Sequence, residues 1–163
     1  MALDAANLKS QGKSIEEVAN YIEENKLCYN QFATVETLEY LKRAGRIKAS
    51  KAFFGNLFGV KPIIISDIKG NNYAFKKIKG RKNSLVELVN LLKESIVDKE
   101  NQTVYVCHAD CIEDAEFVKD LIEKEVGPKE VVTTFLGPII SVSVGPGTIG
   151  VYAKCNAVTI EGN

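Results

Sequence analysis

Two extended segments near the middle of the chain predict a β-hairpin, which restricts the fold to architectures with antiparallel strands. Val60 to Ser66 (VKPIIIS) is rich in β-branched residues, which favour strands. Asp67 to Asn72 (DIKGNN) contains residue types typical of a tight turn. Tyr73 to Ile78 (YAFKKI) then supplies the returning strand. The protein is therefore expected to contain a sheet with at least one antiparallel pair.

Capping signals followed by apolar faces predict two of the helices. Ser14 and Glu17 form a capping box before a helix that continues to about Asn25. Ser84 and Glu87 form a second capping box, and the helix after it has one continuous apolar face. That face consists of Leu85, Leu88, Val89, Leu92 and Ile96. Further helices are expected over Asp4 to Gln11, Val35 to Arg43, Ser50 to Phe58 and Ile112 to Glu125.

Alternating or β-branched segments predict the remaining strands. These segments are Cys28 to Thr34, Thr103 to Ala109, Glu130 to Leu136, Pro138 to Val144 and Thr148 to Lys154. Helices and strands are mixed along the chain, and no linker or internal repeat divides residues 1–163. We therefore expect one α/β domain of the α+β type, with two layers: a mixed, mostly antiparallel sheet of about six strands and helices packed on one face.

The composition excludes several classes of partner. Lys+Arg and Asp+Glu both number 21, so the net charge does not indicate binding to nucleic acid or to an anionic membrane. No apolar run approaches the roughly 20 residues that a membrane-spanning helix requires. The N-terminal sequence MALDAANLKSQGKS lacks the basic and apolar regions of a signal peptide. A cytoplasmic protein is the expectation.

Cys107, His108, Asp110 and Cys111 resemble a metal-binding cluster, but the ligand set is incomplete. No second CxxC or HxxxH pair is available to close a tetrahedral site. Cys107 and His108 also do not suggest a nucleophile and its base, because neighbouring residues on a strand point to opposite faces. We expect no metal, no cofactor and no enzymatic activity.

A basic turn next to an apolar segment suggests a protein that binds an amphiphile. Lys42, Arg43 and Arg46 surround a glycine turn, and Ser50 to Phe58 follows with two adjacent phenylalanines. Such an arrangement can hold a charged head group and an apolar tail.

Several motifs, taken together and in order, resemble the C-terminal part of the DegV family of bacterial fatty-acid-binding proteins. They are TLEYLKRAGRI (Thr37 to Ile47), FGVKPII (Phe58 to Ile64), KIKGRK (Lys77 to Lys82), CHAD (Cys107 to Asp110) and GPIISVSVGPGTIGV (Gly137 to Val151). The resemblance implies a two-layer α/β domain with a mixed sheet. It also implies that the protein holds one long-chain fatty acid and presents the carboxylate to a fatty acid kinase.

The chain departs from the family pattern in two respects. The family's N-terminal domain, which carries Ser/Thr ligands for the carboxylate, has no counterpart, so a fragment or truncated product is expected. Ser143 stands where the family has its head-group histidine. A hydroxyl can donate one hydrogen bond to a carboxylate but contributes no charge, so weaker or rearranged head-group binding is expected.

The resemblance assigns candidate roles to individual residues. Arg46 matches an arginine near the carboxylate and can form a bidentate pair with it, whereas an exposed turn residue is the structural alternative. The amides of Gly145 and Gly147 could face an anion, although a tight turn explains both glycines equally well. The candidates for the acyl tunnel, each of which could equally belong to the plain core, are Phe53, Phe54, Leu57 and Ile64. The candidates for docking the kinase, or simply for a solvated surface, are Lys79, Arg81 and Lys82.

A second function remains open at this point. The chain could be an interaction module that docks a partner and no longer holds lipid, because the N-terminal ligands and the histidine are both missing. In either case, an apolar surface left by the absent domain favours self-association, and a homo-oligomer is expected.

Overall fold

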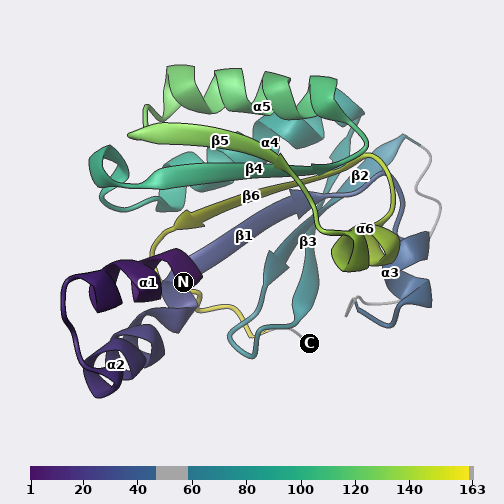
Figure 1. The fold of residues 1–163 in the computed structure, drawn as a ribbon. Coiled ribbons are helices and arrows are strands. Elements are labelled where there is room, and N and C mark those ends of the chain that lie inside the picture. Colours follow the sequence, from purple (N-terminus) through teal and green to yellow (C-terminus); the bar gives the residue numbers. More distant parts are fainter. Residues whose placement is uncertain (47–58, 162–163) are drawn as a thin grey trace.

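The computed structural model describes residues 1–46 and 59–161, and a single β-sheet runs through the middle of the molecule (Figure 1). Within these ranges, six strands pair in the order β3-β2-β1-β6-β4-β5. The parallel pair is β4-β5, and the other neighbours are antiparallel. The strands are β1 (Tyr29–Thr34), β2 (Val60–Ser66), β3 (Asn72–Lys79), β4 (Thr103–Ala109), β5 (Glu130–Phe135) and β6 (Thr148–Lys154). The predicted mixed, mostly antiparallel sheet is confirmed.

The predicted hairpin is formed by β2 and β3, and one carboxylate organises its turn. Asp67 Oδ1 accepts hydrogen bonds from the backbone N–H groups of Lys69 (2.9 Å) and Asn71 (2.8 Å). Asp67 is only 2% exposed, so these bonds are shielded from water and hold the turn in one conformation.

Helices α4 (Arg81–Ser95) and α5 (Ile112–Glu125) cover one face of the sheet (Figure 1). The main apolar cluster lies between these helices and the strands, and it includes Leu88, Val118 and Ile149, which have no exposed surface. Their burial is the principal favourable contribution to folding. The predicted helical layer on this face is thus confirmed, as is the apolar face of α4 from Leu85 to Leu92, whereas Ile96 follows the end of the helix.

A second, smaller apolar cluster lies on the opposite face of the sheet. Ile63 and Ile65 belong to the main cluster, so Ile64 between them points to the other face. There Ile64 packs against Leu38 and against Leu41 of α3 (Glu39–Arg43). Helix α6 (Pro138–Val144) contacts α3 and adds Val144 to this cluster. The prediction of helices on one face alone therefore missed α3 and α6.

The prediction of a strand over Pro138 to Val144 is wrong, because this segment forms α6. Its β-branched composition favours a strand, but both edges of β6 are already occupied by β1 and β4. Pro138 at the first turn suits a helix start, where no N–H is needed. Gly145 then ends the helix with φ 81°, a conformation that favours glycine.

The capping box predicted at Ser84 and Glu87 is also wrong. Helix α4 begins earlier, at Arg81, directly after Gly80. Ser84 lies inside the helix and donates from Oγ to the carbonyl of Arg81 (2.7 Å), while Glu87 pairs with Lys76 (2.7 Å). The basic residues Lys79 to Lys82 therefore comprise the end of β3 and the first residues of α4.

The N-terminal helices agree with the prediction. Helices α1 (Ala2–Ser10) and α2 (Ile15–Asn25) form a hairpin at one end of the sheet, and the capping box of Ser14 and Glu17 is present. Short 3-10 turns, η1 (Lys26–Cys28) and η3 (Lys99–Asn101), precede β1 and β4. The helix expected over Ser50 to Phe58 lies outside the described residues. No helix in residues 1–46 or 59–161 has the length and apolar character needed to cross a bilayer.

Candidate functional site

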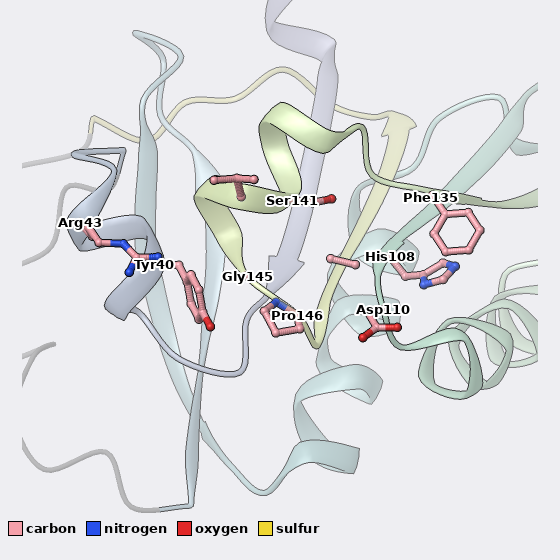
Figure 2. A pocket seen from close by; sticks show the side chains of 10 residues that line it. Tyr40, Arg43, His108, Asp110, Phe135, Ser141, Gly145 and Pro146 are labelled. Atoms are coloured by element: carbon pink, nitrogen blue, oxygen red, sulfur yellow. The ribbon is translucent and has the colours of Figure 1, made fainter.

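A cavity of about 480 Å³ lies where the ends of β4 and β5 meet α3 and α6 (Figure 2). Three parts of the chain that are distant in sequence contribute to it. Its lining residues are Tyr40, Arg43, His108, Ala109, Asp110, Phe135, Ser141, Val142, Gly145 and Pro146. This volume is within the range of small-molecule sites. A second cavity of about 410 Å³ shares His108, Asp110 and Phe135 and extends to the start of α5.

The walls of the first cavity and its surroundings are rich in apolar side chains that remain in contact with solvent. Phe135 is 72% exposed and Val142 is 74% exposed. On α6, Ile139 is 85% exposed and Ile140 is 49% exposed. Apolar residues gathered at one place with this degree of exposure are typical of a binding surface rather than of ordinary protein exterior.

Arg43 supplies the positive charge at this cavity. Its guanidinium carbon lies 5.1 Å from the centroid of the Tyr40 ring, so the charge rests over an aromatic face. No carboxylate within residues 1–46 or 59–161 forms an ion pair with Arg43. Figure 2 shows Asp110 on another side of the cavity, next to His108. Arg43 is thus available to an anionic group of a ligand.

His108 is a buried part of the wall and does not form a catalytic pair with its neighbour. The residue is 1% exposed, its Nδ1 accepts a hydrogen bond from the N–H of Cys111 (3.3 Å), and its ring packs on Phe135 at 4.4 Å. Cys107 lies on the opposite face of β4. Burial raises the pKa of the Cys107 and Cys111 thiols, which disfavours the reactive thiolate form of both. Across the described residues, no group of three or more His, Cys, Asp or Glu side chains is arranged to hold a metal.

Arg46 and Ser143, the two predicted head-group ligands, do not line the cavity. Arg46 is exposed beyond the end of α3, and its Nη1 donates to the carbonyl of Ala44 (3.4 Å). Ser143 Oγ donates to the carbonyl of Ile139 within α6 (3.1 Å). Arg43 and Ser141, which the sequence reasoning did not single out as ligands, are present at the cavity instead. The signal for Arg43 was its place at the end of α3, on the same basic segment as Arg46.

The prediction that the amides of Gly145 and Gly147 face an anion is wrong. The N–H of Gly145 donates to the carbonyl of Ser141 and that of Gly147 donates to the carbonyl of Ala109, both at 2.8 Å. Gly145 serves a different purpose: a Cβ atom at this position would lie 2.4 Å from Cδ2 of Tyr40. The absence of a side chain therefore lets the Tyr40 ring pack directly on the backbone.

The predicted acyl-tunnel residues are only partly described. Phe53, Phe54 and Leu57 lie outside the described residues. Ile64 is 3% exposed in the cluster between β2 and α3, and it does not line the cavity. Ile64 is therefore a residue of the smaller apolar cluster in this structure.

The three predicted docking residues have different surroundings. Arg81 is held by Asp114 (2.8 Å from Nη2 to Oδ2) and by the carbonyl of Gly147 (2.6 Å), so it joins α4 to α5 and to the turn before β6. Lys79 and Lys82 are exposed, and Lys82 Nζ lies 5.6 Å from the Phe117 ring centroid. Lys79 and Lys82 can still contact a partner, whereas the charge of Arg81 is used within the fold.

Comparisons with known proteins identify relatives over almost the whole chain. The profile of a family described as "Uncharacterised protein, DegV family" matches residues 1–155. A DegV domain-containing protein of Clostridium perfringens is 38% identical over 148 residues, which are 91% of this chain and 51% of the relative. The chain thus spans about half the length of the curated relatives it matches.

Solved structures share the fold. A DegV family protein of Ruminococcus gnavus with vaccenic acid has a TM-score of 0.82 and 25% identity, covering 93% of this chain and 54% of the other. A fatty-acid-binding DegV family protein of Thermus thermophilus has a TM-score of 0.81 and 27% identity, covering 94% and 55%.

Proposed function

Because this chain belongs to the DegV family, we propose that it is a lipid-binding domain that holds a long-chain fatty acid in the cavity between α3 and α6. The observation that carries the proposal is the combination of exposed apolar side chains with the guanidinium of Arg43. The solved relatives with bound or named fatty acids support the same ligand class.

The chemistry of the cavity suits both ends of such a ligand. The acyl chain packs against Phe135 and Val142, and the burial of each methylene contributes about 0.8 kcal/mol. The carboxylate pairs with Arg43, whose planar fork can donate two parallel hydrogen bonds. Arg46, which follows the end of α3, remains the alternative anchor suggested by the sequence.

Substitution of the two arginines tests which of them binds the head group. We expect Arg43→Ala to weaken oleate binding about 10-fold, because it removes a charge-assisted hydrogen bond at a partly solvated site. Arg46→Ala is expected to change the dissociation constant by less than about twofold, as for a surface charge away from the ligand. The measurement is a fluorescence displacement titration with oleate.

Lys124→Ala is the matched control. Lys124 is also an exposed basic residue, but it lies near the end of α5 and does not line the cavity. Loss of binding in Arg46→Ala with no change in Arg43→Ala would return the head-group assignment to the residue predicted from the sequence. Equal loss in all three variants would indicate a general charge effect.

In this proposal the protein is a cytoplasmic carrier and not an enzyme, and it presents the carboxylate to a fatty acid kinase. The exposed Lys79 and Lys82 offer a basic surface for that partner. The kinase, rather than this chain, would supply the phosphoryl-transfer chemistry.

The exposed apolar residues of α6 favour a second candidate function, that of an interaction module. Ile139 and Val142 are mostly exposed, and such surfaces promote association. We expect a dimer or larger species by light scattering at micromolar concentration. A monomer that takes up oleate would contradict self-association and leave the carrier function, whereas an oligomer that takes up no lipid would favour the interaction module.

A further inference from the structure

The side chain of Tyr40 contacts both Gly145 and Arg43. The Tyr40 ring lies directly against the backbone of Gly145, since a Cβ there would fall 2.4 Å from Cδ2 and 2.7 Å from Cγ of the ring. Arg43, one turn later on α3, places its guanidinium carbon 5.1 Å from the centroid of the same ring. All three residues line the cavity, and Figure 2 shows Tyr40 and Arg43 extending from α3 toward it.

The contact with Tyr40 bears on the orientation of Arg43, which is an exposed residue. Arg43 has no ion pair in the described ranges, and Tyr40 is the aromatic side chain that it contacts. A long charged side chain that is not held loses rotamer freedom when it binds, and this loss opposes binding. An aromatic face under the guanidinium reduces that loss, because it orients the planar group before the ligand arrives.

We propose that Tyr40 is a positioning residue that, seated on Gly145, holds the Arg43 guanidinium at the cavity and so sets the preference for a carboxylate over an uncharged head group. This inference rests on the proposed function. It assigns to Tyr40 an effect on head-group selectivity that is separate from its contribution to the apolar wall.

The test compares oleate with oleyl alcohol, which share an acyl chain and differ in the charge of the head group. Dissociation constants for both ligands are measured for the wild type, Tyr40→Phe, Tyr40→Leu and Arg43→Ala. We expect the wild type to prefer oleate, and Arg43→Ala to lose the preference. Tyr40→Leu should reduce the preference about two- to fivefold, the range for an exposed cation–π contact, on top of the loss of affinity that both ligands share because Tyr40 also lines the cavity. Tyr40→Phe keeps the ring and should keep the preference.

Several outcomes would overturn the inference. In Tyr40→Leu, an unchanged preference, or an equal loss of affinity for both ligands, would show that Tyr40 acts only as part of the wall. If the wild type binds both ligands equally, Arg43 does not select the carboxylate, and Tyr40 cannot act by positioning Arg43. A wild type that binds neither would overturn the proposed function itself, so the two failures are distinguishable.

A measurement on the wild type tests the inference even if the Tyr40→Leu variant does not fold. The side-chain Nε–H signal of Arg43, assigned by its loss in Arg43→Lys, should show the heteronuclear NOE of an ordered group before any lipid is added. A signal as mobile as that of a free arginine side chain would contradict positioning by Tyr40.

Discussion

Gly145→Ala is expected to lower the free energy of unfolding by about 3 kcal/mol, measured by urea denaturation. Two costs add. Gly145 has φ 81°, where an L-residue is strained by about 1–2 kcal/mol. The new Cβ would also lie 2.4 Å from Cδ2 of Tyr40, and moving a packed ring costs about 1–3 kcal/mol. The substitution should also weaken oleate binding, because Tyr40 lines the cavity.

Gly137→Ala is the matched control at the other end of α6. Gly137 has φ −59° and ψ 152°, and no atom lies within 4 Å of the position of its Cβ. The residue precedes Pro138, where this extended conformation is preferred for any amino acid. We expect a change of less than about 1 kcal/mol, because alanine lowers the entropy of the unfolded chain while the N-cap position of α6 favours glycine, so that the two effects oppose each other. Equal destabilisation by both substitutions would contradict the packing of Tyr40 on Gly145.

Lengthening the ligand from decanoate to myristate is expected to tighten binding about 200-fold. The difference is four methylenes, and each contributes about 0.8 kcal/mol when it leaves water. The expected gain is therefore about 3 kcal/mol. A calorimetric titration series below the solubility limit of each fatty acid measures this dependence directly.

The Arg43→Ala variant provides the control for this series. Because Arg43 contacts the head group in the proposed mode, the variant should show weaker binding at every chain length with the same dependence on length. Dissociation constants that do not change between decanoate and myristate would show that the tail stays in solvent, and would contradict an acyl site in the cavity.

Local patterns predicted the hairpin and the main helices well. The β-branched residues of β2 and the periodic apolar face of α4 are each signals within a single segment, so neighbouring residues determine the result. The segment Pro138 to Val144 was misjudged because its β-branched residues favour a strand, whereas the occupation of both edges of β6 is a property of the whole sheet. The start of α4 was also misjudged. Ser84 and Glu87 have the sequence of a capping box, whereas the helix begins at Arg81, directly after Gly80.

The candidate site depended even more on tertiary structure. Tyr40, Asp110 and Gly145 belong to segments far apart in sequence, and their contact with one cavity follows from the order of the strands. Of the basic segment, Arg43 lines the cavity and Arg46 does not, and this difference depends on where α3 ends. The family resemblance indicated the ligand class, which the residue types alone supported only weakly.

Native mass spectrometry of the protein as purified, followed by organic extraction and by addition of oleate after lipid removal, tests the central proposal most directly. We expect a co-purifying long-chain fatty acid, or uptake of one oleate per chain by the lipid-free protein. A protein that is empty as purified and takes up no oleate would contradict the proposal that this chain holds a fatty acid.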